Sequence, residues 1–318
     1  MTDTTLPASS PALATSESKL VVPRRPVHWQ KIAITVASAA VAIIFFLPIF
    51  WWALASIKPM DEILAVPPKL WGFDPTLNWY RVVIGNADPT KFNLEQSGSV
   101  GRGSGGGTFY SIPYLRDSFI IGFVSTALVL LIATPAAYAL SRFRMRRRKD
   151  MAMWVLSQRM MPPIVAALPL FFMFRNLGIM DSYRGMILVH TAMNLSLATL
   201  LLMSVFDEIP LDLDDAARVD GATRWGAFRQ ILPYVRGGLA ATAVLVFVFS
   251  WNEFILGLVL TQVKIRTVPV ASSTFTTAFA TEWGYLAALG TASMLPIFIF
   301  ILLVQRHVVR GLTLGAVK

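Results

Sequence analysis

The chain carries the stretch Asp215-Ala216-Ala217-Arg218-Val219-Asp220-Gly221-Ala222, followed by Phe228 and by Ile231-Leu232-Pro233. Strongly apolar segments flank it on both sides, at about 186–206 and 239–260. Helix-forming residues on either side of a glycine predict two short helices joined by a sharp turn. Between two apolar segments, such a pair predicts an ordered loop of a membrane protein, large enough to bind a partner protein.

Single residues in this loop predict where each helix begins and ends. Pro210 suits the first turn of a helix, where its missing N–H is not needed, and the aspartates at 212, 214 and 215 suit the helix dipole. Gly221 permits a left-handed turn. Thr223 is a candidate N-cap for the second helix, which Pro233 ends.

The second helix carries an apolar face in a polar setting. Phe228 and Leu232 lie one turn apart on that face, and Trp225 lies three residues away from Phe228. Exposed apolar patches mark interfaces, so this face predicts a docking surface. The alternative is a re-entrant hairpin that packs on its own helix bundle.

Composition places the chain in a membrane. Apolar residues make up 55% of its 318 positions and charged residues 14%, with a mean hydropathy of +0.60, whereas soluble domains carry about 25% charge. Six runs are long enough to cross a bilayer: about 32–56, 119–140, 151–174, 186–206, 239–260 and 285–304. Because lipid cannot satisfy backbone polar groups, these runs must be helices. The predicted fold class is all-α, a polytopic membrane protein with six transmembrane helices.

Basic residues predict the orientation of these spans. Six of the eight residues from Arg142 to Lys149, between the second and third runs, are Arg or Lys. Arg24, Arg25 and Lys31 precede the first run, and further basic residues follow the last. The positive-inside rule then predicts cytoplasmic N- and C-termini and a cytoplasmic 208–236 loop between spans four and five. The net charge of +10 reflects this topology and attraction to anionic lipid, not nucleic-acid binding.

The remaining segments predict a simple domain organisation. Residues 1–30 are expected to form a disordered cytoplasmic tail, and 31–318 the transmembrane domain. The external loop 57–116 has enough Pro and Trp in its first part to pack as an ordered cap, whereas its Gly-rich part, 97–107, is typical of a flexible linker. This linker either touches a delivery protein or is an inert spacer. The chain has no cysteine, and its three histidines are too far apart to suggest a metal site.

Ionisable residues inside spans are costly and therefore mark candidate functional positions. Arg159, next to Gln158, precedes a Pro-Pro break at 162–163 in the third span. Arg159 is either a substrate-path residue or the partner of a structural carboxylate. For Glu253 in the fifth span, a structural ion pair is the favoured interpretation. A pair between Arg159 and Glu253 is a further hypothesis.

Uncharged polar residues form stripes in the fourth and fifth spans. Asn194 belongs to the first stripe, and Ser250, Trp251 and Asn252 to the second. Hydrogen bonds between helices explain such stripes. Trp251 can instead stack on a sugar ring or lie in a membrane-interface belt. The candidate substrate path thus comprises Arg159, Gln158, Asn194, Trp251, Asn252 and Glu253.

Several motifs add a family resemblance over about 32–318. They are the 215–233 loop, Asn78–Tyr80, Ala137–Phe143, Met161–Pro163, Trp251–Phe254 and the ending Arg310–Lys318. Together they resemble the permeases of maltose-type carbohydrate ABC importers, and the ending resembles the MalG-like member of the permease pair. Asp215 stands where the family usually has Glu, and Gly237 where a proline is often found.

The resemblance implies a non-catalytic permease subunit of an ATP-driven importer in the bacterial inner membrane. It implies a homologous second permease, two cytoplasmic ABC ATPases and a periplasmic solute-binding protein, which the 262–283 segment would contact. ATP and Mg would bind to the ATPase, and this chain would bind no cofactor. The expected solute is a sugar, sugar derivative or polyol, and the individual solute stays open. The implied ATPase-coupling residues are Asp215, Ala216, Ala217, Asp220, Gly221, Ala222, Phe228, Leu232 and Pro233.

Two other classes of function remain alternatives. A secondary transporter or channel would explain six spans and a buried charge, but it leaves the ordered 208–236 loop without a purpose. A membrane enzyme would need a catalytic constellation, which the sequence does not suggest. Dependence of transport on ATP distinguishes the first class of protein from the second.

Overall fold

The computed structural model describes residues 29–88, 110–276 and 281–314. The regular structure in these ranges is helical, with one isolated bridge between Thr276 and Thr281. The helices are α1 (Trp29–Ala55), α2 (Met60–Ile63), α3 (Asn78–Val83), α4 (Ile112–Arg142), α5 (Arg148–Met160), α6 (Pro163–Asn176), α7 (Tyr183–Asp207), α8 (Asp212–Val219), α9 (Arg224–Ile231), α10 (Arg236–Trp251), α11 (Ile255–Leu260), α12 (Val268–Ser273) and α13 (Trp283–Leu314). The predicted tail up to residue 28 and the Gly-rich segment 97–107 lie outside the described residues.

The chain divides into two compact units, 1–48 and 49–318. The first unit contains α1 up to Pro48, and its side chains from residue 31 to residue 48 are exposed and mostly apolar. A helix of this kind belongs in lipid or against another apolar subunit, because its apolar surface is unfavourable in water.

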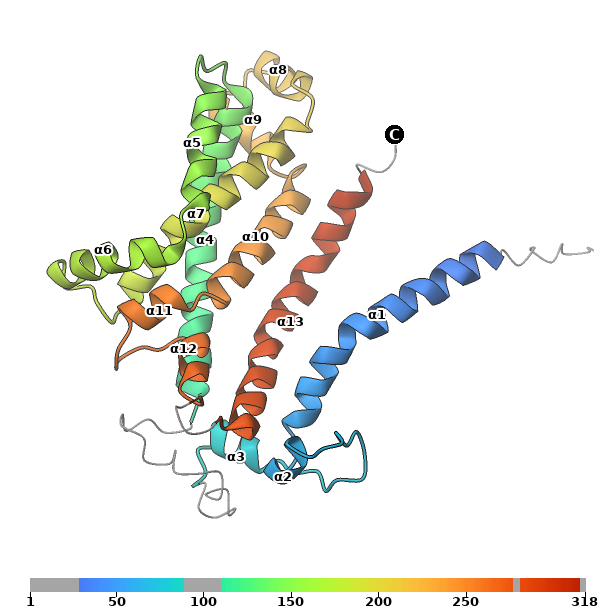
Figure 1. The fold of residues 1–318 in the computed structure, drawn as a ribbon. Helices are drawn as coiled ribbons and strands as arrows, with labels where there is room; N and C mark the ends of the chain where they lie inside the picture. The colour runs from blue at the N-terminus through green and yellow to red at the C-terminus, as the bar shows by residue number, and fades with distance from the viewer. Residues whose placement is uncertain (1–28, 89–109, 277–280, 315–318) are drawn as a thin grey trace, which may run out of the picture. The chain divides into compact units, whose positions relative to one another are not determined.

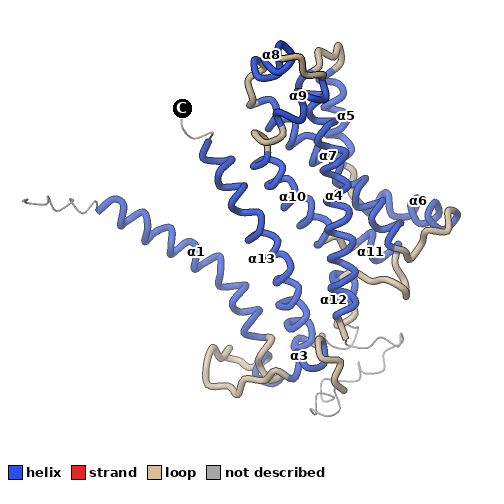
Figure 2. Tube along the Cα trace, turned by 180° about the vertical axis from the view of Figure 1, so that it is seen from behind, coloured by secondary structure: helices blue, strands red, loops and turns tan. Residues whose placement is uncertain are grey.

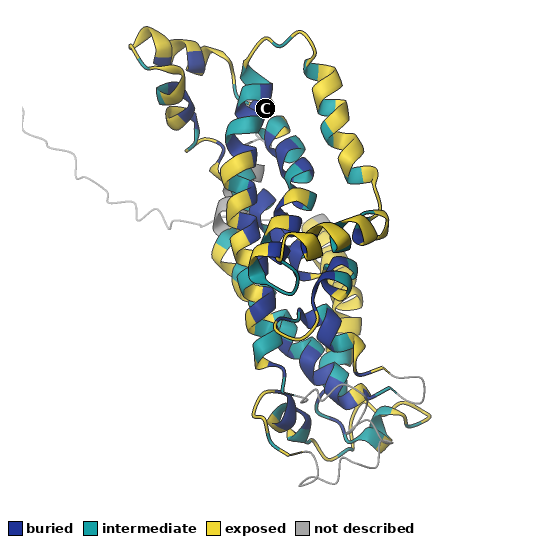
Figure 3. Ribbon diagram, turned by 90° about the vertical axis from the view of Figure 1, so that its left-hand side faces the viewer, coloured by how far each residue is buried: buried dark blue, intermediate teal, exposed yellow. Residues whose placement is uncertain are grey.

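In the second unit α4 and α7 lie side by side, and α10 packs against α4, α7 and α13 (Figures 1 and 2). Small residues permit the close approach of α4 and α7: Ala133, Ala137 and Ala198 are fully buried. Figure 3 shows the buried residues concentrated where the long helices meet, with exposed residues on the outer surfaces.

Four helical segments are long and apolar enough to cross a membrane: Lys31–Ala55, Ile112–Arg142, Tyr183–Asp207 and Trp283–Gln305. Two bent helix pairs raise the number to as many as six if each pair is one span. The pair α5–α6 bends by 86° at the predicted Pro-Pro break, and α9–α10 bends by 78°.

The fifth predicted span, 239–260, is wrong as a continuous helix. α10 ends at Trp251 and α11 begins at Ile255. The Glu253 carboxylate accepts hydrogen bonds from the backbone N–H of Leu256 (2.8 Å) and Gly257 (3.0 Å). It thus satisfies donors that a new helix start leaves unpaired, which explains why the chain restarts there.

The first part of the predicted external loop forms an ordered cap, as expected. The Lys58 side chain is buried, and its ammonium donates to the Lys69 carbonyl and lies 4.8 Å from the Trp51 ring and 5.0 Å from the Phe73 ring. The Trp79 indole donates to the Lys58 carbonyl at 2.7 Å. Cation–π contacts and a backbone acceptor together make this buried charge tolerable.

A carboxylate fixes the loop after α11. Asp181 has a positive φ of 50°, and its carboxylate accepts hydrogen bonds from the four backbone N–H groups of residues 262–265, at 2.8–3.2 Å. Partial burial would raise the pKa of Asp181, but these four donors outweigh it and lower the pKa below the ordinary range. Asp117 accepts from the backbone N–H of Arg266 in the same loop.

Candidate functional site

The 208–236 loop folds as two helices around a glycine, as predicted from the sequence. α8 begins at Asp212, two residues after Pro210, and Gly221 follows it with a φ of +86°. The Thr223 hydroxyl caps α9 by accepting from the Gly226 N–H at 3.1 Å. α9 ends at Ile231, just before Pro233. At Gly221 it is the left-handed backbone that requires glycine, because no neighbouring atom lies within 4 Å of an added Cβ.

α8 has one face turned inward and one turned outward. Asp214 and Ala217, three residues apart, are buried against the bundle. The predicted coupling residues Asp215, Ala216 and Asp220 are exposed. Since successive residues differ in direction by about 100° around a helix, two adjacent aspartates can serve opposite sides of α8.

The packing of α9 differs from the prediction that its apolar face is an exposed docking surface. Phe228 is 5% exposed and belongs to a buried cluster with Phe206, Ile231 and Tyr138, and Leu232 packs against that cluster. The apolar stripe of α9 is covered by its own bundle, because burying Phe228 removes more apolar surface from water than leaving it bare. The loop therefore packs its inner faces on the bundle and leaves only its outer face free.

Other apolar side chains lie on that outer face. Val219 is 87% exposed at the end of α8, and Trp225 is 61% exposed at the start of α9. Trp225 lies over Phe228, with a ring-centroid distance of 4.8 Å. Val219 and Trp225 thus flank Gly221 and Ala222. Trp225 was named with the predicted docking face, whereas Val219 was not.

The inner face of α8 is held by a buried ion pair that the sequence did not predict. Asp214 accepts a hydrogen bond from the Tyr138 hydroxyl at 2.6 Å and pairs with Arg142 at 2.9 Å. The Arg142 and Asp214 side chains are 5% and 12% exposed, and Arg142 also donates to the Ile209 carbonyl at 2.9 Å. Breaking a buried pair by removing one partner costs about 3–5 kcal/mol. The available signal was the Ala137–Phe143 motif, which had no assigned role.

A second carboxylate ties the end of α7 to the start of α5. Asp207 receives two hydrogen bonds from Arg148, at 2.6 and 2.7 Å, and one from the Ser141 hydroxyl. This pair is about 40% exposed, so each contact is screened by solvent. It still places the first residue of α5 beside the last residue of α7.

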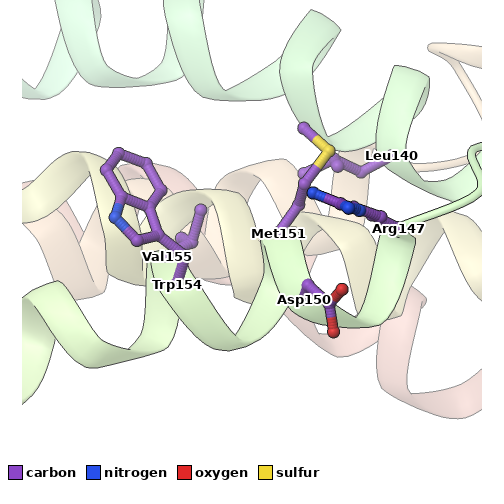
Figure 4. Close-up of a pocket in the computed structure, with 6 residues that line it drawn as sticks. All are labelled: Leu140, Arg147, Asp150, Met151, Trp154 and Val155. Carbon is purple, nitrogen blue, oxygen red and sulfur yellow. The ribbon is translucent and has the colours of Figure 1, made fainter.

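Beside these contacts a pocket of about 290 Å³ opens between the end of α4 and α5. Leu140, Met151, Trp154 and Val155 give it an apolar lining, and Arg147 and Asp150 lie at its edge (Figure 4). None of the predicted substrate-path residues lines it.

The polar stripes of the fourth and fifth predicted spans meet inside the bundle. The Asn194 amide on α7 donates to the Ser250 hydroxyl on α10 at 3.2 Å, and Ser250 lies 3.3 Å from the Ser125 hydroxyl on α4. These three buried groups link three helices, so the expectation of hydrogen bonds between helices is confirmed.

Glu253 and Arg159 do not pair with each other. The side chain of Glu253 caps α11 and has His190 Nε2 at 3.9 Å. Arg159 on α5 lies over the Phe249 ring at 4.5 Å, and in the part of the chain that the structure describes it forms no ion pair. His190 is buried one turn before Asn194, and sequence reasoning missed it. The only sequence feature that could have indicated His190 was an ionisable side chain inside an apolar run.

The other predicted path residues separate into two environments. Trp251 is 3% exposed and packs on Phe247, with ring centroids 5.6 Å apart, so it is not free to stack on a sugar. Asn252 and Gln158 are exposed. The structure thus brings Asn194 and Glu253 together through His190 and Ser250, and leaves Gln158 and Arg159 beside the α5–α6 bend.

Comparison with known proteins agrees with this architecture. The family model described as "Binding-protein-dependent transport system inner membrane component" matches residues 130–314, which include α8 and α9. A crystal structure of a bacterial ABC transporter that imports the acidic polysaccharide alginate has a chain with the same fold. The TM-score is 0.64 at 19% identity, over 87% of this chain and 96% of that one.

Curated relatives match over most of their length. The trehalose transport system permease protein SugB of Mycobacterium tuberculosis is 35% identical over 84% of this chain and 97% of its own. The trehalose/maltose transport system permease protein MalG of Thermococcus litoralis is 32% identical over 91% and 97%. The chain therefore belongs to the binding-protein-dependent transport system inner membrane component family, as a multi-pass inner-membrane permease subunit of an ABC importer.

Proposed function

We propose that this chain forms half of the translocation path of an ATP-driven importer for a sugar, sugar derivative or polyol. The single observation that carries the proposal is the outward face of α8–Gly221–α9, which is ordered and solvent-exposed in a member of this family. The names of three relatives support a carbohydrate: two refer to trehalose, and one to diacetylchitobiose.

The proposed topology has six spans, with both termini and the 208–236 loop in the cytoplasm. The four long helices, the bent pair α5–α6 and the α10 helix of the second bent pair supply the crossings. The basic segment from Arg142 to Lys149 lies at the same end of the bundle as α8, because Arg142 contacts Asp214. Both segments would then face the cytoplasm, in agreement with the positive-inside rule.

The proposed partners are a homologous second permease, two copies of a cytoplasmic ABC ATPase and a periplasmic solute-binding protein. ATP and Mg would bind to the ATPase, and this chain would be non-catalytic. Asp215, Ala216, Asp220, Gly221 and Ala222 would contact the ATPase directly, together with the neighbouring Val219 and Trp225. Ala217, Phe228 and Leu232 would support that surface from beneath, since the first two are buried and Leu232 is partly buried. Pro233 is exposed and would lie at the edge of the surface.

The test is purification of the tagged chain from its native membrane in mild detergent, followed by mass spectrometry of the proteins that accompany it. We expect an ABC ATPase and a second permease of the same family to co-purify. Mg-ATP should then drive solute uptake in vesicles that contain the complex and its binding protein. Recovery of the chain alone, or ATP-independent uptake, would favour a secondary transporter or channel.

For the substrate path we propose the region around Arg159, Gln158, Asn194, Asn252 and Glu253, with Trp251 as packing beneath it. Arg159→Ala removes a half-buried charge from the Phe249 ring, a contact worth about 0.5–2 kcal/mol. We expect lower uptake with unchanged complex assembly and basal ATP hydrolysis, and partial recovery in Arg159→Lys. Loss of assembly in Arg159→Ala would mean that Arg159 is structural.

A further inference from the structure

The Ala137–Phe143 segment at the C-terminal end of α4 is not part of the surface proposed to meet the ATPase. It nevertheless contacts every element of the 208–236 region. Tyr138 and Arg142 bind Asp214 of α8, and Arg142 also binds the carbonyl of Ile209 before α8. The Ser141 hydroxyl donates to Asp207 at the end of α7.

Aromatic contacts connect the same segment of α4 to α9. The Tyr138 ring lies 5.0 Å from the Phe228 ring and 5.5 Å from the Phe206 ring of α7, measured between centroids. The Arg224 guanidinium at the start of α9 lies 5.3 Å from the centre of the Phe143 ring. A single turn of α4 thus contacts α7, α8 and α9 together.

The covalent chain does not provide this connection. The 208–236 loop continues directly into α7 on one side and α10 on the other, whereas α4 reaches it only through side chains. Apart from the packing of α4 along α7, these contacts are the direct connection between α4 and the loop.

The chemistry of the contact resists sliding. Asp214 and Arg142 are almost completely removed from water, and any shift that separates them leaves a charge unpaired in a low-dielectric environment. The short Tyr138 hydrogen bond fixes the second carboxylate oxygen. In addition, Arg148 extends the link to α5 through Asp207.

We propose that the Tyr138–Arg142–Asp214 cluster is a mechanical link that makes α4, and through Asp207 also α5, move as one body with α8 and α9. In this role Tyr138 and Arg142 are positioning residues of the transport cycle. The proposal rests on the proposed function, because it needs an ATPase that moves the loop.

The test uses the complete purified complex and two variants, Tyr138→Phe and Asp214→Asn. Tyr138→Phe removes one hydroxyl, and Asp214→Asn removes the charge at nearly constant shape. The matched control is Tyr183→Phe, which deletes a Tyr–Asp hydrogen bond of the same 2.6 Å length, to Asp117 at the opposite end of α4. We expect both cluster variants to assemble and to hydrolyse ATP at the basal rate. Their ATP-driven uptake should fall about fivefold or more, the lower range of allosteric coupling, while the control keeps its uptake.

A distance measurement provides a readout that a purely structural role would not move. The chain has no cysteine, so spin labels can be placed at Leu131→Cys on α4 and Leu211→Cys before α8, both of which are exposed. With the cluster intact, the distance between the labels should be the same without nucleotide and after trapping with Mg-ATP and vanadate. In Asp214→Asn it should become nucleotide-dependent.

Several results would overturn the link. They are normal uptake in both cluster variants, a nucleotide-dependent distance with the cluster intact, an unchanged distance in Asp214→Asn, or loss of assembly in every cluster variant. Failure of the proposed function looks different, since no ATPase would then accompany even the unaltered chain.

Discussion

At the scale of single residues, Asp214 and Asp215 are adjacent and identical, yet the structure gives them opposite surroundings. Asp214 is buried and paired with Arg142, whereas Asp215 faces solvent on the outer side of α8. A change at Asp214 therefore acts on the packing of the loop. A change at Asp215 acts on whatever binds the outer surface.

Asp215→Lys should leave membrane insertion and folding intact, because exposed substitutions change stability by no more than about 0.5 kcal/mol. It should abolish ATP-driven uptake by reversing the charge presented to the ATPase. Asp212→Lys is the matched control, since Asp212 is also exposed and also lies in the first turn of α8. Equal uptake by both variants would show that the position of the charge is unimportant.

Gly221→Val should also uncouple transport without preventing insertion. A φ of +86° is unfavourable for any β-branched residue, at about 1–2 kcal/mol. There is room for the side chain itself, so the effect comes from the backbone. Gly221→Asn is the control, because Asn tolerates the left-handed region and should retain much of the uptake. If uptake is normal in Gly221→Val, the turn does not need its left-handed conformation.

At the scale of elements, local chemistry in the sequence predicted the starts, ends and breaks of several helices. Gly221, Thr223 and Pro233 specify the geometry of α8 and α9, and the Pro-Pro pair at 162–163 ends α5. The glycine and the prolines act through their own backbone, and Thr223 acts through a hydroxyl that caps the next few residues. The inward turn of Phe228 was not predictable in this way. It depends on Tyr138 and Phe206, which are distant in sequence and become neighbours only when α4 and α7 pack.

The break between α10 and α11 was not predicted, for the same kind of reason. Apolar residues lie on both sides of Asn252 and Glu253, so the run resembles one continuous span. Only the hydrogen bonds that Glu253 accepts from the N–H groups of Leu256 and Gly257 reveal a new helix start. The Arg142–Asp214 pair was likewise invisible, since its partners are 72 positions apart and neither sequence position alone indicates the other.

The loop after α11 gives a pH-dependent prediction. The pKa of Asp181 is lowered in the folded chain, so its ionised form stabilises the 262–265 loop above the ordinary aspartate pKa of about 3.9. This stabilisation should be complete at neutral pH and should be lost as the pH falls through the lower, folded-state pKa.

Hydrogen–deuterium exchange of residues 262–265 measures this effect. Asp181→Asn, which cannot accept four N–H bonds, should lower the protection factors of these amides at neutral pH to the values that the unaltered protein shows in acid. The control is Asp74→Asn, at an exposed aspartate in the cap. Slow exchange in Asp181→Asn would show that the carboxylate does not hold the loop.

At the scale of the whole molecule, the exposed apolar surface indicates what surrounds the protein. Large apolar side chains are exposed on α1, α5, α6 and α13, where a soluble protein would bury them. This surface is stable only against lipid or other subunits. The protein is thus a component whose outer faces are completed by its surroundings.

The number of crossings can be argued from one contact. Arg148 at the start of α5 binds Asp207 at the end of α7, so both residues lie on the same side of the membrane. The chain between them consists of α5, α6 and α7. In the proposed topology α7 crosses once, so we expect the bent pair α5–α6 to cross as well and to return the chain to its starting side.

Single cysteines in this cysteine-free chain test that argument. With six spans and cytoplasmic termini, Lys149→Cys and Asp212→Cys should react with a membrane-impermeant maleimide only after the membrane is opened. Asp74→Cys, in the cap, should react in intact spheroplasts. Were the α5–α6 pair a re-entrant loop, Lys149→Cys and Asp212→Cys would lie on opposite sides of the membrane. The two labelling patterns therefore distinguish six crossings from five. If α5–α6 does not cross, the single crossing of α7 places the two cysteines on opposite sides of the membrane.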